Sequence, residues 1–69
     1  MEFSQLVRIV RNQLDLSQEQ LARNLNISFS TVNRWENGKT VPIPMAKEAF
    51  LQFCQKHNID IDEITRREE

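Results

Sequence analysis

The segment from residue 28 to residue 37 carries side chains that could pair with nucleic-acid bases. In a helix, at about 100° per residue, Val32 and Trp35 would lie on one side. The opposite side would carry hydroxyl, amide and guanidinium groups, from Ser30, Asn33, Arg34 and Asn37. These groups supply the hydrogen-bond donors and acceptors that complement base edges in the major groove of double-stranded DNA. The sequence therefore predicts base contacts from this face.

Arg34 is the candidate with the most specific chemistry. The forked N–H donors of arginine match the two major-groove acceptors of guanine, a contact worth roughly 1–3 kcal/mol of discrimination. Phe29 could contact the C5-methyl group of thymine, or it could pack against Ile27 and the preceding helix. A phosphate contact or a solvated side chain is the alternative for Arg34. A merely solvated polar residue is the alternative for Ser30 and Asn33.

Two short helices joined by a tight turn are predicted in the middle of the chain. Ser17 is the expected N-cap of the first, with Gln20 in the capping-box position. Asn26 falls at the turn, where a positive φ is often needed and asparagine tolerates it. Ser28 is the expected N-cap of the second helix, and Gly38 is its expected left-handed C-cap. This spacing holds the second helix out from the body, so that its polar face can enter a major groove.

Five helices are predicted in total, which makes the fold class all-α. The first has an apolar face with helical spacing, formed by Phe3, Leu6, Val7, Val10 and Leu14. Pro44 suits the first turn of the fourth helix, and Asp60 is the expected N-cap of a short fifth helix. We expect one domain over residues 1–69, with the helix-turn-helix at about 17–37. Residues 65–69 are charged and are expected to fray.

Composition and charge limit the function classes. One Gly, two Pro and 39% hydrophobic residues favour a small helical domain. No apolar run approaches the ~20 residues of a membrane span, and no signal-peptide pattern occurs. A single Cys fits a reducing compartment, so we expect a cytoplasmic location. The net charge of −1 is low for a nucleic-acid binder, but residues 1–47 hold six basic and four acidic side chains, and residues 48–69 hold three and six.

The chain resembles the phage-repressor-like helix-turn-helix family, often called the Cro/XRE type. The similarity lies in L-S-Q-x-x-L-A, then a turn, then S-x-x-T-V-x-x-W-E-N-G-K-x-x-P, between Leu16 and Pro42. The other helices match the five-helix layout of the family more loosely. The resemblance implies a compact five-helix DNA-binding domain in which helices two and three form the helix-turn-helix. It also implies sequence-specific binding of double-stranded DNA by a transcriptional regulator.

The resemblance assigns roles to individual residues. Gln18, in the first turn of helix two, is expected to bind DNA phosphate and to brace the reading helix. Further phosphate contacts are expected from Ser28, Asn37, Lys39 and Thr40. A solubilising charge is the alternative for Lys39. A structural pair between Arg11 and Glu36 would keep this acid from repelling phosphate. The expected packing residues of the motif are Ala22, Val32 and Trp35.

Other functions remain open at this point. The same DNA contact could serve a targeting module of a restriction-modification or toxin–antitoxin system, or the chain could be a protein-interaction domain that has lost DNA binding. We expect no enzyme, metal site or cofactor, because no catalytic set, phosphate-cradling loop or metal cluster occurs. Helix four is apolar on more than one face. This fits a homodimer through helices four and five, or simple coverage by helices one and five.

Overall fold

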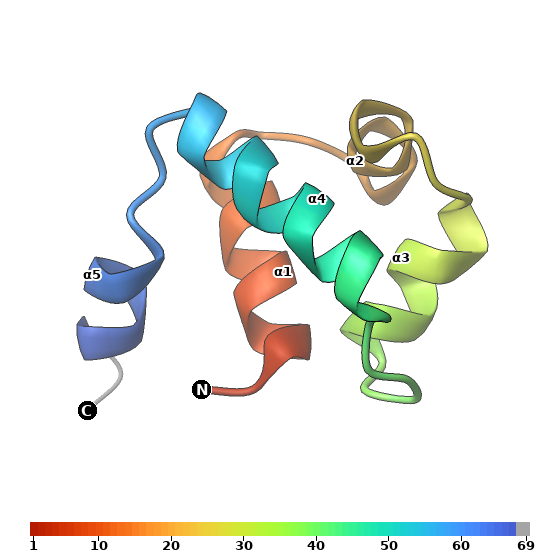
Figure 1. Cartoon of the computed structure of the whole chain (residues 1–69), viewed down its shortest axis with the longest axis horizontal. Coiled ribbons are helices and arrows are strands. Elements are labelled where there is room, and N and C mark those ends of the chain that lie inside the picture. The colour runs from red at the N-terminus through yellow and green to blue at the C-terminus, as the bar shows by residue number, and fades with distance from the viewer. Residues whose placement is uncertain (68–69) are drawn as a thin grey trace.

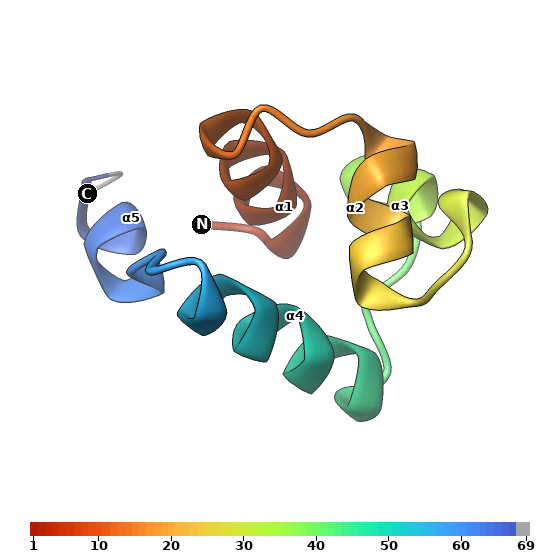
Figure 2. The same ribbon diagram turned by 90° about the horizontal axis from the view of Figure 1, so that it is seen from above.

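The computed structural model describes residues 1–67 and contains five helices in this range. They are α1 (Phe3–Gln13), α2 (Gln18–Leu25), α3 (Phe29–Glu36), α4 (Pro44–Lys56) and α5 (Ile61–Arg67). No strand occurs in the described part of the chain, so the predicted all-α fold class is confirmed. Figure 1 shows α3 and α5 at opposite ends of the molecule, with α1 and α4 between them. The view from above gives the same arrangement, with α4 running along one side (Figure 2).

The N-cap of α2 and the turns that follow α2 and α3 lie where the sequence predicts them. Ser17 Oγ accepts from the Gln20 N–H at 3.0 Å, and Gln20 Oε1 accepts from the Ser17 N–H at 2.8 Å. Asn26 has a φ of 58° in the turn, and Gly38 has a φ of 70° after α3. The predicted capping box and both left-handed residues are therefore present. Two further residues with positive φ were not predicted, Asp15 and Asn58.

The core lies where α1, α2, α3 and α4 meet. The side chain of Trp35 is buried, and the ring of Phe3 lies edge-on to it with centroids 5.3 Å apart. Phe3 makes a second edge contact with Phe50, again at 5.3 Å. Such aromatic pairs add to the stabilisation from burial. The core side chains are Val7, Val10, Leu21, Ala22, Leu25, Val32, Trp35, Phe50, Phe53, Cys54 and Ile64.

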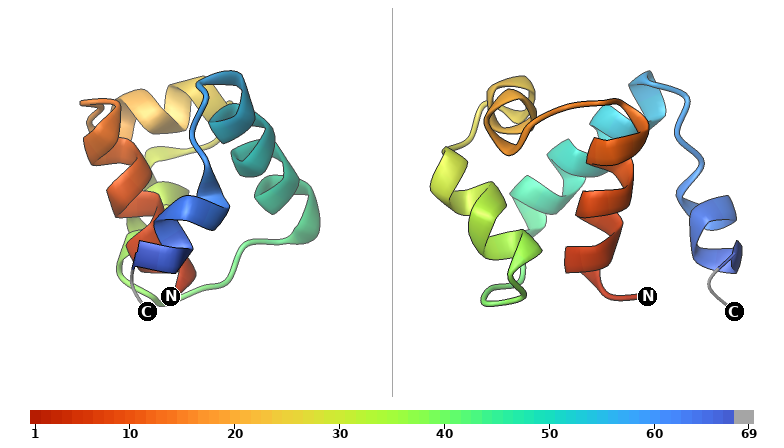
Figure 3. Two further views of the ribbon diagram at one scale, coloured as in Figure 1. Left: turned by 90° about the vertical axis from the view of Figure 1, so that its left-hand side faces the viewer. Right: turned by 180° about the vertical axis from the view of Figure 1, so that it is seen from behind.

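The C-terminal helix extends further than the sequence suggested. Residues 65–67, part of the segment expected to fray, belong to α5. Thr65 Oγ1 donates to the Ile61 carbonyl at 2.9 Å, and Arg67 pairs with Glu63 at 2.9 Å. Ile64 is buried and fixes this helix to the core. Residues 68–69 lie outside the described residues. Figure 3 shows the linker descending from the end of α4 to α5, which lies near α1.

The apolar faces of α4 differ in how far they are covered. Phe50, Phe53 and Cys54 are buried in the core, and Leu51 is half-buried. Met45, in the first turn, is 80% exposed. Coverage within the chain therefore accounts for most of the apolar surface of α4, but not for its beginning. None of the helices within residues 1–67 has both the length and the apolar character to cross a membrane.

Candidate DNA-binding surface

Helix α3 presents two opposite faces, as its sequence predicts. Val32 is fully buried and Trp35 almost so. The other face carries Ser30, Arg34 and Asn37, all exposed, and Asn33, which is half-buried. The helix lies at the outer edge of the molecule (Figures 1 and 3). A polar helix face is therefore open to a partner, and it is held in place by the packing of the opposite face.

Two of the predicted base-contacting residues, Arg34 and Phe29, are exposed at the surface of α3. Arg34 is exposed, and the ion pairs found within residues 1–67 involve other arginines. Its guanidinium donors are thus not engaged by an acid of the described chain. Phe29 has 50% of its surface exposed at the start of α3. This favours the exposed alternative for Phe29 over complete packing against α2.

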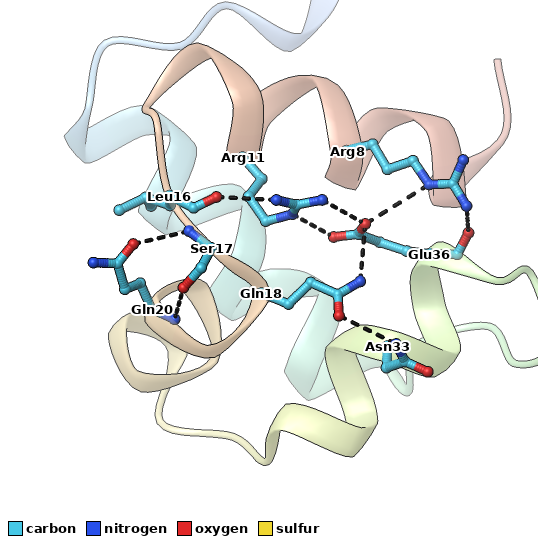
Figure 4. Close-up of polar contacts among 8 residues, drawn as sticks. All are labelled: Arg8, Arg11, Leu16, Ser17, Gln18, Gln20, Asn33 and Glu36. Carbon is cyan, nitrogen blue, oxygen red and sulfur yellow. Dashed lines mark hydrogen bonds and ion pairs between the residues drawn. The ribbon is translucent and has the colours of Figure 1, made fainter.

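The Glu36 carboxylate lies at the centre of a cluster of polar side chains from three helices (Figure 4). Arg11 donates from Nε to Glu36 Oε2 at 2.8 Å and from Nη2 to Glu36 Oε1 at 3.0 Å. Arg11 Nη1 also donates to the Leu16 carbonyl at 3.0 Å, which ties this pair to the loop before α2. Parallel N–H···O bonds from one guanidinium to one carboxylate are among the strongest in proteins. The pair expected between Arg11 and Glu36 is present, and it links α1 to the end of α3.

Two opposing effects act on the pKa of the Glu36 carboxyl group. Burial of the side chain alone would raise the pKa of this carboxyl group. Hydrogen bonds from Arg11 and Gln18, together with the positive charges of Arg11 and Arg8, outweigh burial and leave the pKa lowered. The hydrogen bond to Glu36 in turn raises the pKa of Arg11. Glu36 is therefore ionised and compensated inside the domain, which removes the expected repulsion toward a bound phosphate.

A line of carboxamides continues from this cluster onto α3. Gln18 Nε2 donates to Glu36 Oε1 at 3.1 Å, and Gln18 Oε1 accepts from Asn33 Nδ2 at 3.1 Å. Asn37 Nδ2 donates to Asn33 Oδ1 at 3.0 Å. Gln18 thus connects the first turn of α2 to the middle of α3, as the bracing role expected for it requires. Asn33, predicted only as a base contact, also takes part in this internal network.

The other predicted phosphate contacts lie at the two ends of α3. Ser28 is exposed, and its Oγ accepts from the Thr31 N–H at 3.1 Å, so it also caps the helix. Lys39 and Thr40 are exposed in the loop after the helix. The Lys39 N–H donates to the Arg34 carbonyl at 3.1 Å, which holds the start of this loop against the end of α3.

Arg8 belongs to the cluster although the sequence did not point to it. Its Nη2 donates to the main-chain carbonyl of Glu36 at 2.7 Å, and its Nε lies 3.7 Å from Glu36 Oε1. More than half of the Arg8 side chain remains exposed. The available signal was its spacing: Arg8 and Arg11 are three residues apart and therefore share one face of α1.

Helices α2 and α3 pack together, and the turn between them contains a residue in the left-handed conformation, Asn26. Together with the open polar face of α3, this arrangement defines a helix-turn-helix DNA-binding domain. Residues 7–48 match the family described as Helix-turn-helix. The chain belongs to the phage-repressor-like branch of this family that its motif resembles, so the recognition made from the sequence is confirmed.

Two similar proteins illustrate the kinds of protein in which such domains are found. The chain is 34% identical over 61 residues to the Type II methyltransferase M.MspI of Moraxella sp, covering 88% of this chain and 14% of that protein. It is 33% identical over 69 residues to the HTH-type transcriptional activator BcrR of Enterococcus faecalis, covering 100% and 32%. The chain thus spans a third or less of the length of these relatives. No solved structure is significantly similar to it.

Proposed function

We propose that this domain binds double-stranded DNA in a sequence-specific manner, with α3 in the major groove. The observation that carries the proposal is the open polar face of α3, opposite the buried Val32 and Trp35. Its hydroxyl, carboxamide and guanidinium groups complement base edges. Membership of the helix-turn-helix family supports the same conclusion.

The proposed contacts fall into two sets. Base edges are contacted by Phe29, Ser30, Asn33 and Arg34. Backbone phosphates are contacted by Gln18, Ser28, Asn37, Lys39 and Thr40. The first set provides discrimination between sequences, and the second fixes the position of the domain on the duplex.

We place the domain, residues 1–69, in a transcriptional regulator. The relative named as a transcriptional activator matches along the whole chain, which supports this assignment. In this role the chain binds DNA without catalysing a reaction, in the cytoplasm, and as a homodimer through α4 and α5. The second candidate is a targeting module of a restriction-modification system, and the methyltransferase relative is the observation that favours it. Reporter expression from a promoter carrying the selected site separates the two, because a regulator changes transcription and a targeting module does not.

The proposal is tested by selecting bound duplexes from a random pool and then mapping the winner by amide chemical shifts. Shifts should concentrate at Gln18, at residues 28–34 and at residues 37–40. A perturbation centred on α4 would contradict the major-groove arrangement. A selected site with two-fold symmetry, bound by two chains in analytical ultracentrifugation, would support the dimer.

Arg34 and Lys39 provide a sharper test because their proposed roles differ. Arg34→Ala should weaken binding to the selected site far more than to random DNA, because Arg34 lies on the reading face. Lys39→Ala should weaken binding to all sequences alike and reduce the slope of log affinity against log salt by about one unit. Fluorescence anisotropy at several salt concentrations measures both effects. If Lys39→Ala relaxed the sequence preference and Arg34→Ala did not, the assignment of α3 would be wrong.

A further inference from the structure

The Glu36 carboxylate is the last acceptor in a chain of hydrogen bonds formed by three carboxamide side chains. Its Oε1 accepts from Gln18 Nε2, and Gln18 Oε1 accepts from Asn33 Nδ2. Asn33 Oδ1 then accepts from Asn37 Nδ2. Every hydrogen bond in the chain therefore points in the same direction, toward the carboxylate. Figure 4 shows the part of the chain from Glu36 to Asn33.

The direction of this chain follows from the charge of Glu36. An ionised carboxylate has no proton to donate, so it can only accept hydrogen bonds. Gln18 must therefore turn its NH₂ group toward Glu36, which leaves its oxygen facing Asn33. Asn33 must in turn present its NH₂ group to Gln18, and its oxygen then faces Asn37. One buried charge thus fixes the orientation of three side chains that could otherwise be rotated by 180° with little change of shape.

The orientation of Asn33 matters because this residue lies on the reading face. Its internal bonds use one N–H and one lone pair of the carboxamide. One N–H and one lone pair therefore remain for a ligand. Bidentate recognition of adenine by asparagine needs a donor and an acceptor in a set order. A reversed carboxamide would present the opposite order to the same base pair.

We propose that Glu36 determines part of the DNA sequence preference without touching DNA, by fixing through Gln18 the donor–acceptor order that Asn33 presents to the major groove. Glu36 is thus a positioning residue, and Phe29, Ser30, Asn33 and Arg34 remain the groups proposed to meet base edges. The inference rests on the proposed DNA-binding function and adds to it the origin of specificity at one base pair.

The series of hydrogen bonds from Asn37 to Glu36 is tested first in the protein without DNA. Gln18→Met keeps the length of the side chain but removes both of its hydrogen bonds, while Arg11 and Glu36 stay paired. The side-chain amide signals of Asn33 should then shift, and their exchange with water should accelerate severalfold. Gln13→Met is the matched control, because Gln13 is an exposed glutamine at the end of α1. This control should leave the Asn33 signals unchanged.

The consequence for recognition is tested by duplex selection with two variants. In Gln18→Met, discrimination at one base pair should fall by about fivefold or more, while the other positions keep their preference. Loss of the phosphate contact proposed for Gln18 should in addition lower affinity for all sequences alike, but it would not by itself change the preference at a single base pair. Glu36→Gln should relax the same base pair, because a neutral carboxamide can donate or accept, and it leaves Gln18 in place. Gln18→Met remains sufficient if Glu36→Gln does not fold.

Three results would overturn the inference, and they differ in what they say about DNA binding. Unchanged Asn33 amide signals in Gln18→Met would show that no such chain orients Asn33. Altered signals with an unaltered selected sequence would refute the role in specificity, while the proposed function would stand. If the wild-type protein selected no sequence at all, the proposed function would fail, and the inference with it.

Discussion

The ion pair between Arg11 and Glu36 should contribute far more to stability than the exposed pair between Arg23 and Glu19. Arg11→Met leaves the Glu36 carboxylate in place, with only 3% of its side chain exposed. Removing one partner of a buried ion pair costs about 3–5 kcal/mol, because the remaining charge is uncompensated. We expect the lower end, about 3 kcal/mol, since Gln18 still donates to Glu36 and Arg8 Nε lies 3.7 Å from it.

This loss is large for so small a domain. At roughly 0.05–0.15 kcal/mol per residue, the free energy of unfolding of 69 residues is about 3–10 kcal/mol. Arg11→Met should therefore remove about 30% or more of the free energy of unfolding, as measured by urea unfolding. Arg23→Met is the matched control, because Arg23 and Glu19 form an i,i+4 pair with both side chains at least 70% exposed. Its cost should stay below about 1 kcal/mol.

The pH dependence identifies the charge as the cause. Glu36 has a lowered pKa in the folded wild type. Its contribution is therefore fully present above the unfolded pKa of about 4.5 and is lost as the pH falls through the folded pKa. In Arg11→Met, burial should dominate and raise the pKa of Glu36, so that protonation stabilises the variant. The difference in unfolding free energy between wild type and Arg11→Met should therefore narrow between pH 7 and about pH 3.5.

Two outcomes would refute this reasoning. If Arg11→Met and Arg23→Met cost the same, the burial of Glu36 would have no energetic consequence. If Arg11→Met were costly but the cost did not change with pH, its origin would be lost side-chain packing rather than an uncompensated carboxylate.

Three further predictions concern single buried or strained positions. Trp35→Ala should cost about 3–5 kcal/mol and largely unfold the domain in thermal melts; a folded variant with native-like melting would mean that the ring contributes little to the core. Gly38→Ala should cost about 1–2 kcal/mol because the φ of 70° disfavours a Cβ atom, and no neighbouring atom lies within 4 Å of the added Cβ to contribute a clash. An unchanged melting temperature would contradict the left-handed C-cap. Burial raises the pKa of the Cys54 thiol to about 11, so a thiol reagent at pH 8 should label the native protein far more slowly than the urea-unfolded chain; equal rates would show that Cys54 is accessible.

The helix pair could be predicted from the sequence because its signals are local. A serine cap with glutamine three residues later specifies the start of α2 within a single turn. Asn26 and Gly38 occupy positions where few other residues tolerate a positive φ. Val32 and Trp35 follow from the helical period alone. Each of these features depends on neighbours within a few positions of the chain, so the tertiary structure does not need to be known.

The polar network was only partly predictable because it depends on how helices pack. Arg11 and Glu36 are 25 residues apart, and their pairing came from family resemblance rather than from spacing. Arg8, 28 residues from Glu36, was missed because a surface arginine on α1 has many solvated alternatives. The internal bonds of Asn33 were missed for a related reason: a carboxamide on a polar helix face gives no sign of which neighbour it meets. The burial of Ile64 in the core is likewise a tertiary contact, which the charged sequence of residues 65–69 does not indicate.

The buried carboxylate also bears on how a domain with a net charge of −1 could bind DNA. Arg11 compensates Glu36 inside the structure, so this acid adds little negative potential at the surface. Arg34 and Lys39 then face solvent near α3 without an acidic partner among the ion pairs of residues 1–67. So few basic groups neutralise few phosphate charges, and affinity should depend only weakly on salt. Discrimination must then come mainly from correctly oriented groups on α3, which is the property that a fixed carboxamide order would provide.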